Sequence, residues 1–247
     1  MEGQRIQINN AFYEDLGDAW YEDTVHPIAL LRAENAARNP WILDQIKHRF
    51  GSTCDILDLG CGAGFLTNFL ASHGHQVTGI DLSLRTLEVA KKRDLTKSVC
   101  YRQLDALNLP FQSQSFDVIC AMDFLEHVER PGQIISLAAN LLRPKGLFFF
   151  HTFNRNLLSW LMVIKGVEWC VPNTPANMHV YSYFIKPVEL KNWCQRSGLH
   201  IKEIHGLSPR LVSKAFWKSF FSRKVDPKLE FCKTSSLKVG YMGVAQA

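Results

Sequence analysis

The chain has 247 residues, 47% of them hydrophobic, which supports one large domain with a substantial core rather than two independent domains. The formal net charge of +5 is modest, and the basic residues that stand beside aromatic ones are confined to one short segment, so no nucleic-acid partner is expected. We therefore expect a single domain over residues 1–247.

Cysteines and apolar runs indicate the setting of the protein. The seven cysteines are odd in number and lack the spacing of a zinc site or a redox pair. Residues 1–10 show no secretory signal, and the longest apolar run, residues 157–164, falls well short of the roughly 18 residues that a spanning helix needs. These features favour a reducing, cytoplasmic protein that can touch a membrane without crossing it.

Residues 10–50 are predicted to form a helical cap in front of a sheet. Aromatic and aliphatic side chains such as Phe12, Leu16 and Trp20 recur along this stretch, and Pro27 and Pro40 are expected to interrupt the helices.

From residue 55 onward, short apolar strands alternate with helical patterns. Five strands are predicted at residues 56–59, 76–80, 99–104, 116–121 and 146–152, and two more at residues 199–204 and 239–244 close the sheet edge. Strands separated by helices indicate βαβ units and a parallel sheet. The predicted fold class is therefore α/β, a Rossmann-like, doubly wound sheet of seven mostly parallel strands.

Two segments decorate this pattern. An apolar, aromatic-rich insert at residues 157–184 follows the fifth strand, and a helix is expected from Pro187 to Ser197, capped by Gly198. A basic segment at residues 208–236 separates the last two strands. It holds seven basic and two acidic residues, and this difference of five equals the formal excess of the whole protein.

The sharpest local pattern is a glycine-rich turn, with Gly60, Gly62 and Gly64, between a strand and a helix. Glycine lets the backbone approach a ligand closely, and in a parallel sheet this turn lies at the carboxyl ends of the strands, where ligands bind. Asp81, 21 residues after Gly60 and at the end of the next strand, is placed to accept hydrogen bonds from both hydroxyls of a ribose. The alternative is a turn that serves packing alone.

Both a dinucleotide and S-adenosylmethionine would suit a glycine turn followed by an acid. The dinucleotide fingerprint requires glycine or alanine where Phe65 stands, so the tighter glycine pattern favours S-adenosylmethionine. Asp105 could accept from an adenine amino group or cap a helix, and Met122 could pack on the adenosine or belong to the core. The predicted cofactor-binding positions from these strand ends are Gly60, Cys61, Gly62, Asp81, Leu82, Asp105, Ala106 and Met122.

Asp123, Glu126 and His127 follow the fourth strand. On a helix they would share one face, where two carboxylates and an imidazole could hold a divalent ion such as Mg²⁺. Equally, Asp123 followed three residues later by Glu126 has the spacing of a capping box at a helix N-terminus. His151 and Asn154, after the fifth strand, could line an acceptor pocket or serve strand-end packing.

Several segments resemble a known family. The runs LDLGCGAG, FDVICAMDFLEHVERP, FFHTFNRNLLSWLMVIKGVEW and FIKPVEL resemble the ubiquinone-biosynthesis O-methyltransferases, and the similarity extends from about residue 12 to residue 206. The resemblance implies a class I methyltransferase fold, S-adenosylmethionine as the donor and a polyprenylated phenol or demethylubiquinol as the acceptor.

The resemblance also implies roles for particular residues. Arg32 would bind the methionine carboxylate of the donor, and Gly60, Asp81 and Met122 would also contact the donor. His179, which precedes the FIKP segment, would be the base, and His127 is the second candidate catalytic residue. Members from eukaryotes have a magnesium site at positions that match Asp123, Glu126 and His127.

A tailed acceptor also suggests partners. The insert at residues 157–184 is expected to present an apolar patch to membrane lipids at the inner face of the membrane. The other enzymes of quinone biosynthesis are a second class of partner that the resemblance suggests. The segment KAFWKSFFSRK interleaves aromatics with cations and could be an interfacial helix or a helix packed on the domain with a solvated basic face.

Three other functions are alternatives to an O-methyltransferase of ubiquinone biosynthesis. They are a methyltransferase of another small phenolic or natural-product acceptor, an NAD-dependent oxidoreductase, and a non-catalytic lipid-binding protein that kept the fold.

Overall fold

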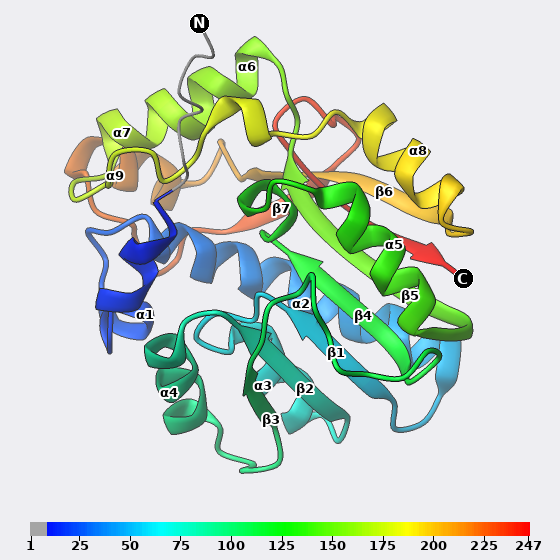
Figure 1. Ribbon diagram of the computed structural model, residues 1–247. Helices are drawn as coiled ribbons and strands as arrows, with labels where there is room; N and C mark the ends of the chain where they lie inside the picture. Colours follow the sequence, from blue (N-terminus) through cyan, green and yellow to red (C-terminus); the bar gives the residue numbers. More distant parts are fainter. Residues whose placement is uncertain (1–8) are drawn as a thin grey trace, which may run out of the picture.

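A computed structural model describes residues 9–247. The prediction that residues 1–10 carry no secretory signal therefore lies largely outside the described residues. The chain forms one sheet with strand order β3-β2-β1-β4-β5-β8-β6-β7 (Figure 1). The strands are β1 (Asp55–Leu59), β2 (Gln76–Asp81), β3 (Cys100–Gln103), β4 (Phe116–Met122), β5 (Leu142–Phe153), β6 (His200–Pro209), β7 (Phe231–Thr234) and β8 (Gly240–Gln246).

The predicted α/β fold is confirmed, with a correction to its edge. Strands β1 to β5 pair in parallel, whereas β8 lies between β5 and β6 and pairs antiparallel with both. The short strand β7 adds an eighth strand on the outside of β6, within the segment predicted to be only a basic connection. The edge is thus formed by β7, and β8 is an interior strand.

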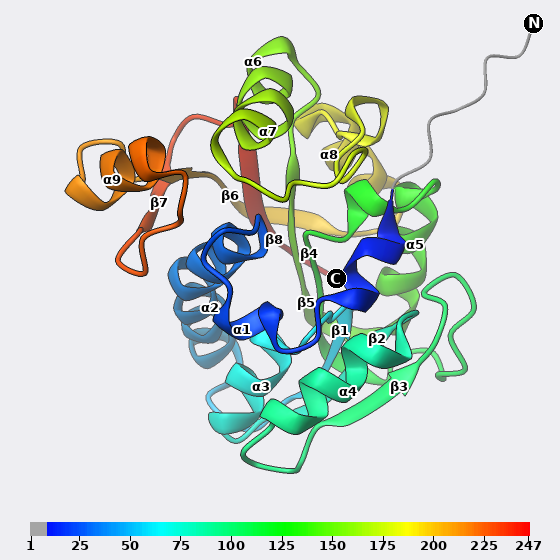
Figure 2. The same ribbon diagram turned by 90° about the vertical axis from the view of Figure 1, so that its left-hand side faces the viewer.

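Helices cover both faces of the sheet (Figure 2). One core joins the sheet to α5 (Pro131–Leu141) and α8 (Pro187–Arg196), and the other joins it to α2 (Ile28–Phe50) and α3 (Phe65–Ser72). Successive residues of β5 alternate between them, because side chains along a strand point to opposite faces: Phe148 and Phe150 belong to the first core and Phe149 to the second. Helix α4 (Leu84–Arg93) packs near β2 and β3.

The N-terminal cap consists of η1 (Asn10–Asp15), α1 (Ala19–Glu22) and α2. Pro27 precedes α2 as predicted, but Pro40 lies inside the helix and does not end it, at the cost of one backbone hydrogen bond. Ion pairs connect the cap to α4. One of them joins Asp18 to Lys92, with 3.0 Å between the carboxyl oxygen and Nζ. The cap therefore covers the edge of the sheet where β1 and β2 end (Figure 2).

The insert after β5 is a run of helical turns, α6 (Leu157–Ser159), the π-helical η3 (Trp160–Gly166) and α7 (Val167–Cys170), followed by η4 (Tyr181–Tyr183). Only part of its apolar surface is exposed. Leu161, Met162 and Trp169 face solvent, whereas Val163 and Phe184 are buried against Phe153 of β5. The predicted single exposed patch is thus partly a small core.

The basic segment forms α9 (Lys214–Ser222) and β7. Among residues 9–247, no helix combines the length and the apolar character that a membrane crossing requires.

Candidate active site

The glycine-rich turn leaves β1 and enters α3. Gly60 and Gly62 have φ angles of +66° and +52°, a region that residues with a side chain seldom adopt. A Cβ at Gly60 would also overlap the ring of Phe124, and one at Gly62 would come within 3.3 Å of Trp20. The turn therefore depends on glycine both for its backbone angles and for space.

Asp81 ends β2 beside this turn. One carboxyl oxygen accepts from the backbone N–H of Gly62 at 3.0 Å, and the other accepts from that of Ser83 at 2.9 Å. Burial raises the pKa of Asp81, and these hydrogen bonds oppose the shift. Each oxygen keeps a further lone pair, so the carboxylate is oriented by the backbone and can still accept hydrogen bonds from a ligand.

The other strand ends meet at the same place. Asp105 and Ala106 follow β3, and Met122 ends β4; Asp105 accepts from the backbone N–H of Leu107 at 2.9 Å, which makes it a turn residue as well. All the predicted cofactor positions from the strand ends line one cavity: Gly60, Cys61, Gly62, Asp81, Leu82, Asp105, Ala106 and Met122.

That cavity has a volume of about 1160 Å³. From the glycine turn it extends past His127 and His179 to side chains of the insert and of α9, among them Met162 and Phe220. Ligand cavities usually measure roughly 300–1,000 Å³. The cavity therefore exceeds the usual volume and has room for more than one ligand.

A cluster of buried charges lies beside the strand ends. Asp123 has a left-handed backbone, with φ of +54°, and accepts hydrogen bonds from the Arg38 guanidinium and from Nδ1 of His151. Burial alone would raise the pKa of Asp123, but the Arg38 and His151 charges outweigh it and lower the pKa. Burial would likewise lower the pKa of His151, but Asp123 raises it. Arg38, Asp123 and His151 thus form a buried ionic triad.

Three further carboxyl groups near this triad have raised pKa values. Burial, followed by the charge of Asp123, raises the pKa of Glu34 to about 7 and that of Glu126 to about 8. Burial also raises the pKa of Asp58 to about 8, against the effect of Arg38. At neutral pH, Asp58 and Glu126 are therefore mainly uncharged, which limits the negative charge gathered around Arg38.

His127 and His179 lie next to each other in the cavity, with ring centroids 5.7 Å apart. Burial lowers the pKa of His127 to about 4 and that of His179 to about 3, and in both the negative charge of Asp123 opposes the shift. Tyr13 of the cap contacts His127, with ring centroids 5.9 Å apart. Both imidazoles are thus neutral at pH 7, the form that accepts a proton.

The predicted metal ligands do not form one set. After Asp123 the chain makes only the short η2 (Leu125–His127), and the side chain of Asp123 does not cap it, so the capping-box prediction is wrong as well. Among the described residues, the acidic and histidine side chains close enough to share an ion are Glu34, Asp123 and His151. Both carboxyl oxygens of Asp123 are already hydrogen-bonded, one to the permanent charge of Arg38. These residues therefore do not fit Mg²⁺.

Arg32 lies elsewhere than the resemblance implied. Its guanidinium donates to the backbone carbonyls of Ala19, Trp20 and Asp23, and it is not part of the cavity wall. Asn154 donates to the carbonyl of Leu237 at 2.8 Å, a connection between loops rather than a pocket contact.

Sequence reasoning missed Arg38 as a site residue. It lies six residues beyond Arg32 on the same helix, it is 1% exposed, and it lines the cavity. Its Nε and Nη1 atoms make no hydrogen bond with any described residue. The signal that could have indicated it is its place on α2 opposite the end of β4, which only the folded chain reveals.

Known proteins resemble this chain in sequence and in fold. Residues 57–150 match the model of a family described as a methyltransferase domain. A ubiquinone biosynthesis O-methyltransferase of Actinobacillus pleuropneumoniae serotype 5b is 36% identical over 218 residues, covering 83% of this chain and 89% of that protein. A protein of the same name from Leptothrix cholodnii is 34% identical over 213 residues, covering 85% and 89%.

Solved structures give the same fold at low sequence identity. A SAM-dependent methyltransferase of Thermotoga maritima superposes with a TM-score of 0.63 at 15% identity, over 96% of this chain and 98% of that one. Magnesium protoporphyrin IX methyltransferase from Synechocystis, with bound SAH, gives 0.59 at 17% identity, over 89% and 84%. The glycine turn, the position of Asp81 and the sequence relatives all agree with this fold. The chain belongs to the class I S-adenosylmethionine-dependent methyltransferases.

Proposed function

We propose that this enzyme transfers a methyl group to a phenolic hydroxyl of a polyprenylated catechol or demethylubiquinol, an acceptor of ubiquinone biosynthesis. The observation that carries the proposal is the single cavity that joins the glycine turn to an apolar end at the insert and α9. The relatives that cover most of the chain have names that point to the same pathway.

The donor would be held at the glycine turn. Asp81 would accept from the ribose hydroxyls, and Met122, Leu82 and Ala106 would line the adenosine. For the methionine carboxylate we propose Arg38 in place of Arg32, because Arg38 lines the cavity and two of its buried nitrogens lack hydrogen-bond partners among the described residues. When bound, S-adenosylmethionine supplies a methyl group already activated by the positive sulfonium.

The chain must still activate the nucleophile, which is the hydroxyl oxygen of the acceptor. A phenol with a pKa of about 10 is ionised to roughly one part in a thousand at pH 7, so attack as phenolate costs about 4 kcal/mol. A neutral imidazole beside the hydroxyl can take the proton as the new bond forms. We assign this role to His179, with His127 next to it, and the negative charge of Asp123 would stabilise the imidazolium that results.

The acceptor's ring would lie near these imidazoles and its tail would follow the apolar end of the cavity. Phe153, Val163 and Met178 line this region, and all three are buried. Leu161, Met162 and Trp169 are exposed at the insert and would contact the membrane that holds the tail. The enzyme would therefore work at the membrane surface, where other enzymes that modify the same quinone precursor could associate with it.

Transfer of a labelled methyl group from S-adenosylmethionine tests the proposal. We expect label in a demethylubiquinol with a short isoprenoid tail, and a much lower kcat/KM with the same ring lacking the tail. Equal rates with both acceptors would favour the alternative, a methyltransferase of a small soluble phenol. No transfer to any phenol would reject O-methylation.

A further inference from the structure

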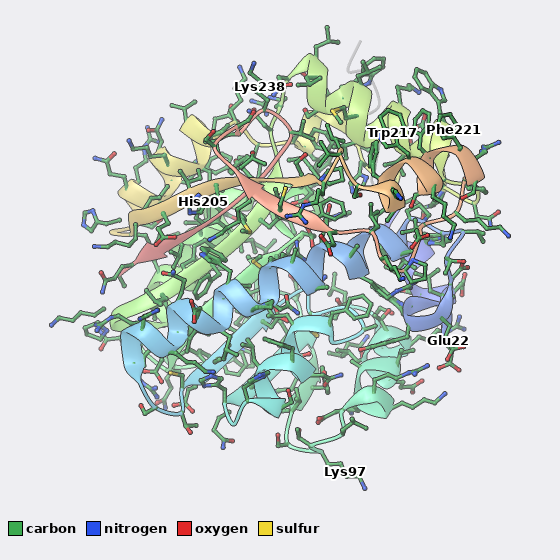
Figure 3. The ribbon with its side chains drawn as sticks, turned by 180° about the vertical axis from the view of Figure 1, so that it is seen from behind. Glu22, Lys97, His205, Trp217, Phe221 and Lys238 are labelled. Carbon is green, nitrogen blue, oxygen red and sulfur yellow. The ribbon has the colours of Figure 1, made fainter. Side chains whose placement is uncertain are left out.

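Helix α9 exposes a cluster of aromatic side chains. Trp217, Phe220 and Phe221 have 50%, 46% and 76% of their surface accessible to solvent, and Figure 3 shows Trp217 and Phe221 at the edge of the molecule. Their rings contact one another, with Trp217 and Phe221 stacked at a centroid distance of 6.0 Å. Contiguous exposed apolar surface of this kind usually marks a contact site.

The exposed face of α9 is not needed to hold the helix in place. Ser213 caps its first turn by accepting from the backbone N–H of Phe216 at 3.1 Å, and Phe216 packs against the buried cluster that contains Ala29 of α2. Just after the helix, the backbone N–H of Val225 donates to the carbonyl of Thr24 at 2.7 Å. The helix is therefore anchored by one face and both ends, and the aromatic cluster faces away.

Unpaired cations surround this cluster. Lys218 pairs with Asp226 at 2.8 Å and Arg210 pairs with Glu230 at 3.0 Å, which uses both acidic residues of the basic segment. Within residues 9–247, Lys214, Arg223 and Lys224 make no salt bridge, and all three are exposed. An apolar patch beside uncompensated cations is complementary to a surface that is apolar inside and negatively charged outside.

The cluster also lies at the mouth of the cavity. Phe220, Phe221, Arg223 and Lys224 of this region line the cavity together with Leu161, Met162 and Trp169 of the insert. Figure 1 shows α9 and α7 on the same side of the molecule. Two elements that are distant in sequence thus frame one opening, and Arg223 and Lys224, directly after α9, bring cations to it.

We propose that α9, with Arg223 and Lys224, is a docking surface for an anionic lipid bilayer. It holds the mouth of the cavity against the membrane, so that a tailed acceptor passes from lipid into the site without crossing water. The docking rests on charge and exposure alone, whereas the entry of an acceptor rests on the proposed function.

Sedimentation of the full chain with vesicles tests the docking surface without donor or acceptor. We expect binding to vesicles of phosphatidylcholine with phosphatidylglycerol, weaker binding to phosphatidylcholine alone, and loss of the difference at high salt. The triple variant Lys214→Glu, Arg223→Glu, Lys224→Glu should bind anionic vesicles about a hundredfold more weakly. The variant Trp217→Ser, Phe221→Ser should lose about tenfold or more on both vesicles.

Matched controls make changes of the same kind elsewhere on the surface. Lys91→Glu, Lys191→Glu, Lys202→Glu makes the same change in net charge at exposed sites on α4, α8 and β6, and Leu95→Ser, Val188→Ser removes exposed apolar side chains. Both controls should bind like the wild type, and the unfolding temperatures of all variants should stay close to the wild-type value.

The outcomes separate this proposal from the function. Absence of vesicle binding by the wild type, or equal losses in the α9 variants and their controls, would overturn the docking surface. Normal binding by both α9 variants would assign any membrane contact to the insert and would overturn it as well. Vesicle binding of the expected kind without methyl transfer to a tailed phenol would leave the docking surface standing and reject the acceptor.

Discussion

Arg38 and Arg32 lie on the same helix, and their guanidinium groups have different surroundings. Arg32 is engaged by backbone carbonyls of the N-terminal cap, whereas Arg38 meets Asp123 in the cavity wall and has nitrogens to spare. We expect Arg38→Lys to weaken S-adenosylhomocysteine binding by about tenfold, roughly 1.4 kcal/mol, because lysine keeps the charge but loses the planar fork.

Arg32→Lys is the matched control for this prediction. It removes the planar guanidinium from a side chain outside the cavity wall. The affinity of this variant for S-adenosylhomocysteine, measured by calorimetry, should therefore stay within about twofold of the wild type. Weaker binding by Arg32→Lys and unchanged binding by Arg38→Lys would mean that Arg32 binds the carboxylate of the cofactor.

His179 is the proposed base. We expect His179→Ala to lower kcat by about a hundredfold or more, the usual contribution of a positioned base, while S-adenosylhomocysteine affinity changes little. The measurement is the initial rate at several pH values, since an acceptor already ionised at high pH needs the base less. A rate within a few-fold of the wild type at neutral pH would dismiss His179 as the base.

Glu126 should make stability depend on pH. Its pKa rises from 4.5 to about 8 on folding. Between these values the unfolded chain has lost a proton that the folded protein keeps, so this group lowers the free energy of unfolding as the pH rises, by up to about 1.4 kcal/mol per pH unit. Below pH 4.5 both states are protonated and its contribution is fully present.

The variant Glu126→Gln has no proton to lose. Compared with the wild type, its free energy of unfolding from urea titrations should improve steadily between pH 4.5 and about 8. Parallel pH profiles for the two proteins would mean that Glu126 ionises normally in the fold.

The sequence predicted the cofactor end of the site better than the ionic triad of Arg38, Asp123 and His151. Gly60, Gly62 and Asp81 stand at strand ends whose spacing is visible along the chain, and they line the cavity. The triad could not be predicted, because Arg38 and His151 reach Asp123 from distant elements. The spacing of Asp123 and Glu126 suited a capping box equally well, and nothing in it reveals a left-handed turn.

The short element η2 after β4 does not present the predicted Mg²⁺ ligands as one set. Because η2 is a single 3₁₀ turn, Asp123, Glu126 and His127 do not share a helical face, and both carboxyl oxygens of Asp123 are already hydrogen-bonded, one of them to Arg38. We expect methyl transfer to stay within about twofold after treatment with EDTA, because a permanent guanidinium replaces the ion electrostatically. A tenfold loss that Mg²⁺ restores would contradict this account of the triad.

Regular elements followed from hydrophobic periodicity, and the exceptions have physical reasons. Strands β1, β2 and β4 and helix α8 lie where predicted within a residue or two. Strand β7 was missed because it is short, lies at the edge of the sheet and belongs to a segment of basic composition. Helix α2 continues through Pro40 because its buried face, with Trp41, Ile42 and Ile46, packs into the core and outweighs one lost hydrogen bond.

The whole molecule is organised around one cavity that no single segment encloses. The N-terminal cap contributes Trp20, the strand ends contribute the glycine turn, and the insert and α9 contribute the far end. The Rossmann-like fold was predictable from alternating strands and helices. The presence of α9 and the insert at the same end of the cavity was not predictable, because it depends on β8 entering between β5 and β6 and so carrying the basic segment to that side.

Calorimetric titration with S-adenosylhomocysteine tests most directly whether this cavity binds an adenosyl donor. The wild type should bind one equivalent saturably, Asp81→Ala should bind at least tenfold more weakly because two ribose hydrogen bonds are lost, and NADH should give no heat. Saturable binding of NADH, or no binding of S-adenosylhomocysteine by a folded wild-type protein, would contradict the account.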